Sequence, residues 1–306
     1  MILTVASGKG GTGKTTVATS LALAMADEVP CLLDCDVEAP NAHLLMHPEF
    51  MQQHDVLLPV PVIDEGRCSQ CGMCAEVCQF NAIVMVGGKP MVFPELCHGC
   101  GSCVHHCPEQ ALYEQPRRIG ILNFGRSSAG TPFANGVLDV GEALAVPVIR
   151  QLTASAACDG NANVIRDAPP GTSCPVVETL KGSDYALLVT EPTPFGLHDL
   201  KLAVSLCQEL GLTVGVVINR AAERADGVEM YCRQAQIPIL MRIPMDRHIA
   251  ECLASGEALV EAMPAYRARF QELWQRVTEL AAQEDPSLTR SAGGSSSPSP
   301  GHRWDR

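Results

Sequence analysis

The first 18 residues, MILTVASGKGGTGKTTVA (Met1–Ala18), decide the fold that the rest of the chain completes. Apolar residues at positions 2–6 predict a short buried strand, and the alanines and leucines from Thr15 to Ala26 predict a helix. Between them, Gly8–Thr15 matches the pattern G-x-x-x-x-G-K-[ST]. Glycines let backbone N–H groups turn inward around phosphate oxygens, and the positive end of the helix dipole strengthens the attraction. The stretch therefore predicts a phosphate-binding loop.

Two side chains of this loop have predicted roles in binding a nucleoside triphosphate. Lys14 is expected to reach the β and γ phosphates, and the Thr15 hydroxyl to bind Mg²⁺. A glycine-rich turn without a ligand is the alternative, although strand, loop, Lys-Thr pair and helix follow in the required order. The residues predicted to contact the nucleotide here are Gly8, Gly10, Gly11, Thr12, Gly13, Lys14, Thr15 and Thr16.

An additional lysine, Lys9 in KGGTGKT, makes the loop resemble the deviant Walker A motif of the MinD/ParA/Mrp superfamily of ATPases. The nitrogenase iron protein belongs to the same group. In that family the first lysine reaches across a dimer interface, so the resemblance implies an ATP-dependent homodimer, or a heterodimer with a related ATPase. Such a cation can offset transition-state charge, as an arginine finger does. The alternative is that Lys9 is an exposed loop lysine.

Two downstream segments resemble the switch regions of the same family. CLLDCDVEAPN (31–41) resembles switch I, which implies that Asp34 lies near the Mg²⁺ ion and that Asp36 orients the attacking water. NVIRDAPPGTS (163–173) resembles Walker B and switch II, which implies Asp167 in the Mg²⁺ shell and Gly171 near the γ-phosphate. Arg166 departs from the pattern, because an apolar residue is usual inside that strand.

The adenine site and the fold class follow from the same resemblance. VGVVINR (214–220) and RIPMD (242–246) resemble the segments that hold the base, and they imply contacts from Asn219, Arg220, Pro244 and Asp246. Strands alternate with helices along the sequence, which predicts an α/β fold with a doubly wound parallel sheet. The nucleotide is then expected at the carboxyl ends of the strands.

Eight of the 15 cysteines form two runs with the same spacing. Cys68-x2-Cys71-x2-Cys74-x3-Cys78 recurs 29 residues later as Cys97-x2-Cys100-x2-Cys103-x3-Cys107, followed by Pro108. This duplication resembles the bacterial two-cluster ferredoxin and implies two [4Fe–4S] clusters in an inserted α+β domain. The alternative is zinc, which prefers ligand pairs separated by a long loop. The resemblance implies that cluster I is bound by Cys68, Cys71, Cys74 and Cys107, and cluster II by Cys97, Cys100, Cys103 and Cys78.

The other cysteines are expected to be reduced, and most of them to be small core residues. Cys35 and Cys174 lie nearer the predicted nucleotide site, where a redox role is the alternative. The formal net charge is −12 with only 22 lysines and arginines, which disfavours nucleic acid and anionic membrane surfaces as partners. Without a secretory signal or an apolar run of roughly 18 residues, we expect a cytoplasmic protein without stable membrane insertion.

These motifs divide the chain into four segments. Residues 1–60 and 119–285 are predicted to form the ATPase, 61–118 the inserted ferredoxin domain and 286–306 a disordered tail rich in Ser, Gly and Pro. The segment AYRARFQELWQRVTELAA (265–282) predicts a closing helix. Its mixed charges favour packing on the core over the alternative, attachment to a membrane.

Three functions are compatible with this combination. The first is ATP-gated electron transfer, by analogy with the nitrogenase iron protein, to a redox or metalloenzyme partner. The second is an assembly factor that carries or inserts metal clusters. The third is a redox-sensing switch or positioning ATPase. All three predict slow ATP hydrolysis that a partner stimulates.

Overall fold

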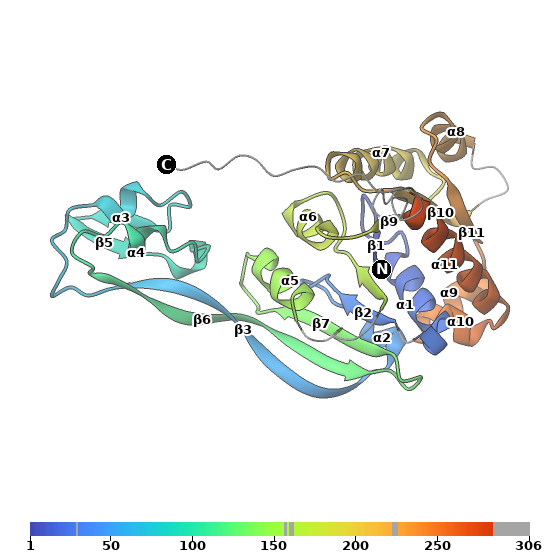
Figure 1. The fold of residues 1–306 in the computed structure, drawn as a ribbon, viewed down its shortest axis with the longest axis horizontal. Helices are drawn as coiled ribbons and strands as arrows, with labels where there is room; N and C mark the ends of the chain where they lie inside the picture. The colour runs from blue at the N-terminus through green and yellow to red at the C-terminus, as the bar shows by residue number, and fades with distance from the viewer. Residues whose placement is uncertain (29, 156–157, 159–161, 222–225, 284–306) are drawn as a thin grey trace, which may run out of the picture.

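A single β-sheet organises the chain (Figure 1). The computed structural model describes residues 1–28, 30–155, 158, 162–221 and 226–283, and within these ranges nine strands form the sheet in the order β11-β10-β9-β1-β8-β2-β7-β6-β3. Its strands are β1 (Ile2–Ala6), β2 (Cys31–Asp34), β3 (Glu49–Ile63), β6 (Leu112–Arg126), β7 (Pro132–Leu138), β8 (Val164–Asp167), β9 (Tyr185–Thr190), β10 (Val214–Ala221) and β11 (Ile239–Pro244).

The strands from β11 to β7 are parallel, and helices cover both faces of the sheet. On one face α1, α10 and α11 pack together, and on the other face lie α5, α6, α7 and α8. This confirms the predicted α/β parallel sheet. The helices are α1 (Lys14–Ala24), α2 (His43–Met46), α5 (Ala145–Thr153), α6 (Cys174–Leu180), α7 (Pro194–Glu209), α8 (Asp226–Gln234), α9 (Arg247–Ala254), α10 (Leu259–Ala262) and α11 (Ala265–Gln283).

The closing helix α11 packs on the core, as the sequence predicts. Its apolar side chains Tyr266, Phe270 and Trp274 are buried in the same cluster as α1 and the central strands. This face is covered by the protein itself, which confirms the predicted packing on the core. In the described part of the chain, no helix is both long and apolar enough to cross a bilayer. The predicted disordered tail, 286–306, lies outside the described residues.

Strands β3 and β6 form a long antiparallel ribbon at the edge of the sheet. Their pairing runs from Glu49 opposite Arg126 to Ile63 opposite Leu112. The pairing of β6 with β7 stops where Gly120 meets Leu138, at the carboxyl end of β7. Residues 57–63 and 112–118 therefore project beyond that end, over roughly 20 Å at the usual rise per residue. The ribbon leaves the sheet at the edge where the parallel strands end.

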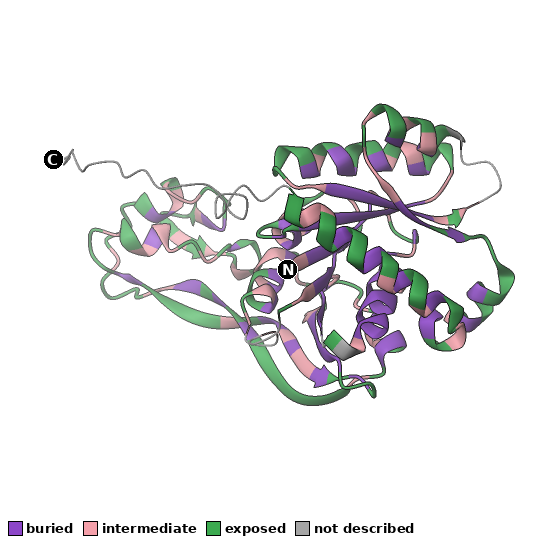
Figure 2. Cartoon of the chain, turned by 45° about the vertical axis from the view of Figure 1, so that its right-hand side comes forward, coloured by how far each residue is buried: buried purple, intermediate pink, exposed green. Residues whose placement is uncertain are grey.

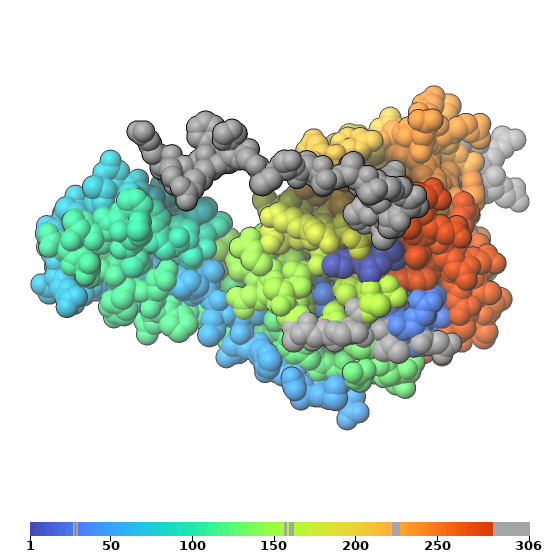
Figure 3. Space-filling view, in the orientation of Figure 1, coloured from blue at the N-terminus to red at the C-terminus, as the bar shows by residue number. Residues whose placement is uncertain are grey.

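The projecting ribbon carries a small distal unit, residues 64–111, that stands away from the body of the molecule (Figure 3). It contains the hairpin β4 (Ile83–Val86) and β5 (Lys89–Val92), the helices α3 (Met73–Glu76) and α4 (Ser102–His105), and the short 3₁₀ helix Pro94–Leu96. Figure 2 shows that the ribbon and this unit are mostly exposed, whereas the central strands are buried. The predicted insert 61–118 thus begins and ends within the ribbon.

The sequence duplication is repeated in the backbone of the distal unit. Helices α3 and α4 are offset by 29 residues, and each follows a glycine with a positive φ, Gly72 at 80° and Gly101 at 71°. Asn81 and Gln110, also 29 residues apart, have positive φ values of 53° and 48°. Two copies of one local fold are therefore present.

One expectation from the sequence is wrong. Cys31 and Cys158, which were expected to be free core thiols, form a disulfide, because the start of β2 and the segment after α5 bring their Cα atoms within 5.4 Å. Arg166, which departs from the family pattern, is nevertheless buried in β8, where it is only 7% exposed. Its guanidinium donates to the carbonyl oxygens of Thr179 (2.9 Å) and Lys181 (2.8 Å) at the end of α6.

The disulfide provides a test of the fold. It joins residues 127 positions apart, so it restricts the unfolded chain strongly. We expect Cys158→Ser to lower the free energy of unfolding by about 2–4 kcal/mol without reductant and to have little effect with it. Denaturant unfolding measures this, and peptide mass spectrometry identifies the bond. If wild type and Cys158→Ser were equally stable without reductant, the Cys31–Cys158 disulfide would be contradicted.

Candidate functional site

The phosphate loop joins β1 to α1, at the carboxyl edge of the sheet. Gly11 and Gly13 adopt positive φ values of 77° and 94°, which glycine tolerates without strain. Gly8 is required for a second reason: a Cβ there would lie 2.2 Å from the carbonyl oxygen of Asp199 in α7. The loop is also held from β10, because Asn219 Nδ2 donates to the carbonyl oxygen of Thr12 at 2.7 Å.

Lys14, Thr15 and Asp167 lie together at the start of α1. Thr15 Oγ1 donates to Asp167 Oδ2 at 2.6 Å. Burial raises the pKa of Asp167 to about 7, against the hydrogen bond from Thr15 and the charge of Lys14. Burial also lowers the pKa of Lys14, against the charges of Asp167, Asp36 and Asp34. One cation and several carboxylates are thus held close together with little water.

Asp34 and Asp36 end β2 beside this group. Asp34 is fully buried, and its carboxylate accepts backbone N–H groups of Asp36 (3.2 Å), Asn41 (3.0 Å) and Ala42 (2.9 Å). Burial and the nearby Asp167 raise its pKa well above the ordinary value. Asp36 is half-buried, and burial raises its pKa against the charge of Lys14. Asp34 therefore holds the turn that presents Asp36.

The donor set fits a magnesium–nucleotide complex. Asp167 Oδ1 is buried and has no hydrogen-bond partner among the described residues, as expected for an oxygen that binds a cation. A cation there would also favour the charged form of a carboxylate whose pKa is raised. Thr15 and Asp167 would hold Mg²⁺, and Lys14 with the glycine N–H groups would hold the phosphates.

Lys9 is engaged within its own chain. Its Nζ lies 3.3 Å from Glu191 Oε2, and Arg220 forms an ion pair with the other oxygen of the same carboxylate. Glu191 directly follows β9 and is only 12% exposed in its side chain. It was missed in the sequence, where its position after the apolar run YALLVT was the available signal.

The residues predicted to surround the base are divided between neighbouring strand ends. Asn219 and Arg220 lie in β10, Pro244 ends β11, and Asp246 caps α9 by accepting the N–H of His248 at 2.8 Å. Asn219 is brought to the phosphate loop. Pro244 and Asp246 lie one strand farther out.

The eight cysteines of the two runs surround two separate cavities in the distal unit. Within the described residues, no three His, Cys, Asp or Glu side chains are arranged to hold a single metal ion. One cavity is lined by Cys68, Cys71, Cys74 and Cys107, and the other by Cys78, Cys97, Cys100 and Cys103. In each cavity three cysteines come from one run and the fourth from the other run.

The surroundings of these cysteines fit a thiolate-bound centre. Cys78 Sγ accepts the N–H of Ala82 and Cys107 Sγ that of Ala111, both at 3.3 Å, and Cys97 Sγ accepts the N–H of Gly99 at 3.4 Å. Burial raises the pKa of Cys103 to about 11, so the free thiol is protonated at neutral pH. Metal binding would then release protons, and the N–H groups would stabilise the thiolates.

The remaining free thiols show different environments. Burial raises the pKa of Cys35 above its usual range, which disfavours a reactive thiolate. Cys207, Cys232 and Cys252 are buried, as predicted, and Cys174 is exposed at the start of α6.

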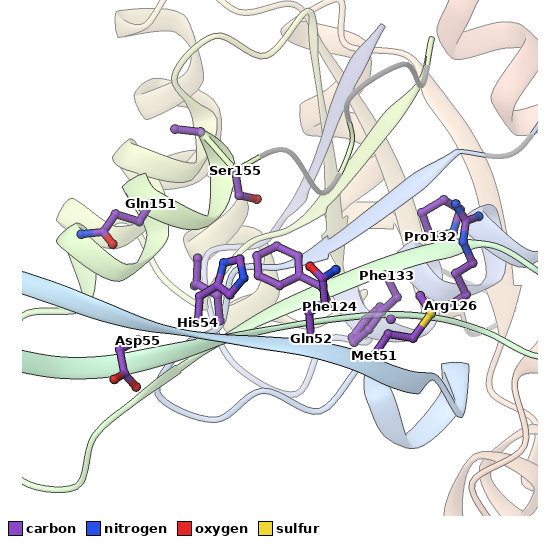
Figure 4. A pocket seen from close by; sticks show the side chains of 13 residues that line it. Met51, Gln52, His54, Asp55, Phe124, Arg126, Pro132, Phe133, Gln151 and Ser155 are labelled. Carbon is purple, nitrogen blue, oxygen red and sulfur yellow. The ribbon is translucent and has the colours of Figure 1, made fainter.

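A further cavity lies away from both groups of residues (Figure 4). It measures about 680 Å³ and lies between the end of α5 and the strands β3, β6 and β7. Ser155 and Gln151 lie across from His54 and Phe124, whose rings pack with centroids 5.1 Å apart. Pro132 and Phe133 place it toward the amino ends of the parallel strands, so we do not assign it to the nucleotide.

Comparison with known proteins shows similarity along most of the chain. An uncharacterised protein of Methanocaldococcus jannaschii is 32% identical over 298 residues, which cover 92% of this chain and 96% of that protein. A cytosolic Fe-S cluster assembly factor NUBP2 homolog of Culex quinquefasciatus is 25% identical over 283 residues, 86% of this chain and 90% of that protein.

Solved structures show the same fold. The septum site-determining protein MinD of Pyrococcus horikoshii, solved with Mg-ADP, aligns with a TM-score of 0.55 and 19% identity. The alignment covers 94% of this chain and 99% of that one. The CobQ/CobB/MinD/ParA nucleotide binding domain matches residues 3–260. With the phosphate loop and the parallel sheet described above, this match shows that the chain belongs to the CobQ/CobB/MinD/ParA family of nucleotide-binding domains.

Proposed function

We propose that the chain hydrolyses ATP with Mg²⁺ and couples nucleotide-driven dimerisation and switch movement to electron transfer through two [4Fe–4S] clusters. One observation carries this proposal. The ribbon that bears both cysteine cavities leaves the sheet at the edge where the phosphate loop, Asp34 and Asp167 lie. The predicted nucleotide site and the ribbon that bears the distal unit therefore adjoin the same edge of the sheet.

The residues of the phosphate loop and strand ends divide the work of hydrolysis. Lys14 and the loop N–H groups neutralise the β and γ phosphates, and Thr15 and Asp167 hold Mg²⁺. Asp36 orients the attacking water, with Asp34 fixing its turn. Lys9 is the cation that would leave Glu191 and reach a partner's nucleotide when two copies, or a copy and a related ATPase, associate.

The clusters would supply one-electron transfer to or from a redox or metalloenzyme partner. The two cavities are adjacent in one small unit, and each has one exposed cysteine, Cys71 in the first and Cys100 in the second. The other six cysteines are buried or half-buried, which limits access of solvent. This arrangement suits electron exchange better than release of an intact cluster.

Assembly of iron–sulfur clusters is the second candidate, and the relatives with that name favour it. It requires that a cluster leave the protein. Incubation of the reconstituted chain with an apo-ferredoxin and ATP separates the two functions. Under our proposal iron stays with the chain, whereas ATP-dependent transfer to the acceptor would support assembly instead.

The two loop lysines give the first prediction of this proposal. Lys14→Ala should weaken ATP binding by at least about tenfold, because it removes the cation buried beside the phosphates. Lys9→Ala should bind ATP normally but lose at least about tenfold in dimer-dependent hydrolysis. Calorimetry and phosphate release measure these effects, with Lys89→Ala in the distal unit as the control. Wild-type turnover by Lys9→Ala would show that Lys9 has no part in hydrolysis.

The raised pKa of Asp167 gives a pH-dependent prediction. Since this pKa is about 7 in the folded chain and 3.8 as the ordinary value, the carboxyl group costs stability as pH rises from about 4 to 7. Without nucleotide or magnesium, Asp167→Asn should therefore melt a few degrees above wild type at pH 8, and the difference should shrink by pH 5.

Magnesium and ATP should reverse that order at pH 8, because the wild-type carboxylate then binds the cation. Melting curves at both pH values measure both effects. If the melting temperatures of wild type and Asp167→Asn differ by the same amount at both pH values, Asp167 is not the group that titrates.

The crossed ligand sets give a third prediction. Cys107→Ser should alter the same cluster as Cys68→Ser, and Cys78→Ser the same cluster as Cys97→Ser, each with loss of about half the iron. Electron paramagnetic resonance of the reduced protein distinguishes the two clusters, and Cys207→Ser in the ATPase core is the control. If Cys107→Ser altered the same cluster as Cys97→Ser, the crossed ligand sets would be wrong. Zinc in place of iron would refute the clusters.

A further inference from the structure

One guanidinium joins the distal unit to the body of the protein. Arg117 lies in the projecting part of β6, and both its terminal nitrogens donate to the carboxylate of Glu142, with Nη2 2.9 Å from Oε2. The same Nη2 donates to the carbonyl oxygen of Pro94 at 3.2 Å. The two side chains are only 22% and 12% exposed. This geometry, partly shielded and bidentate, is the stronger kind of ion pair.

On the distal side, the contact ends next to a predicted cluster ligand. Pro94 begins the 3₁₀ helix Pro94–Leu96, directly before Cys97. The carbonyl oxygen of Pro94 that accepts from Arg117 also accepts the backbone N–H of Cys97, at 3.2 Å. A single peptide group therefore separates Arg117 from the start of the second cysteine run.

On the body side, the contact leads to switch I. Glu142 lies in the loop after β7, and Leu138 at the end of β7 donates its N–H to the carbonyl oxygen of Val37 at 2.8 Å. Val37 follows Asp36 directly and is buried. It also occupies the space above Gly136, where an added Cβ would lie 2.7 Å from Val37 Cγ1. Movement of the Asp36–Val37 segment would therefore disturb its hydrogen bond and its packing with the end of β7.

The loop itself is fixed to the ribbon at a second point. Asp139 donates its N–H to the carbonyl oxygen of Ile119 at 2.9 Å, and its carboxylate accepts Arg118 Nε at 3.0 Å. Arg118 is 52% exposed, so solvent screens this pair. Of the two arginines, Arg117 makes the shielded contact that reaches the distal unit.

We propose that Arg117, held by Glu142, is a positioning residue that transmits nucleotide-driven movement of Asp36–Val37 to the Cys97 segment, an inference that rests on the nucleotide and cluster sites proposed above. The route has three contacts, Val37 with Leu138, Glu142 with Arg117, and Arg117 with Pro94. The loop from Leu138 to Glu142 joins the first contact to the second. Coupling along this route predicts a nucleotide-dependent response at its far end, in the Cys97 segment.

The experiment is amide hydrogen exchange of the full chain with Mg-ADP and with a magnesium complex of a non-hydrolysable ATP analogue. In wild type, exchange of peptides within 94–103 should differ by about threefold or more between the two nucleotides. Glu142→Gln keeps the shape but removes the charge, and it should abolish this difference. Glu142→Asp should restore part of it. The control Glu229→Gln removes a more exposed ion pair, with Arg242 at 3.0 Å at the opposite edge of the sheet, and should respond as wild type does.

Two results would overturn the inference. One is a nucleotide-dependent difference in Glu142→Gln equal to that in wild type, and the other is no such difference in wild type that binds nucleotide. Iron content and nucleotide affinity of the same samples report on the proposed function separately. If the wild-type protein contains no iron or binds no nucleotide, the proposed sites are refuted. If it has both but its exchange does not respond to the nucleotide, only the role of Arg117 is refuted.

Discussion

The parallel direction of the central strands is the constraint on which the rest of the structure depends. Because β1, β2, β7 and β8 run the same way, their carboxyl ends meet at one edge. The phosphate loop, the carboxylates of Asp34 and Asp167, and the exit of the ribbon are therefore brought together. Segments more than 100 residues apart in sequence therefore become neighbours there.

Burial of like charges at this edge comes at the expense of stability in the free protein. Asp34 and Asp167 both have raised pKa values because they are desolvated, and Lys14 only partly compensates for them. A bound cation removes that cost, so the site is better suited to the loaded state than to the empty one. In the distal unit, burial likewise favours the protonated form of thiols such as Cys103 around the two cavities, and a bound metal centre would favour the thiolates.

The sequence predicted those parts of the molecule that depend on local spacing. The phosphate loop, the closing helix and the duplicated cysteine runs each lie within a short stretch, where a few residues determine the geometry. The long ribbon was not predicted, because Pro59, Pro61 and Pro116 interrupt its strands and suggest a linker. Proline is tolerated there, since a strand at an open edge has N–H groups that need no partner.

The remaining features require distant segments to meet, which no local pattern specifies. Glu191 pairs with Lys9, Cys31 bonds to Cys158, and Arg166 caps α6, all through contacts made by the finished sheet. The ribbon has one more consequence, which is mechanical: it is a lever arm. With an arm of roughly 20 Å, a rotation of about 5° at its base displaces its tip by about 2 Å. A movement too small to unfold a switch segment would therefore displace the distal end of the ribbon by about the size of an atom.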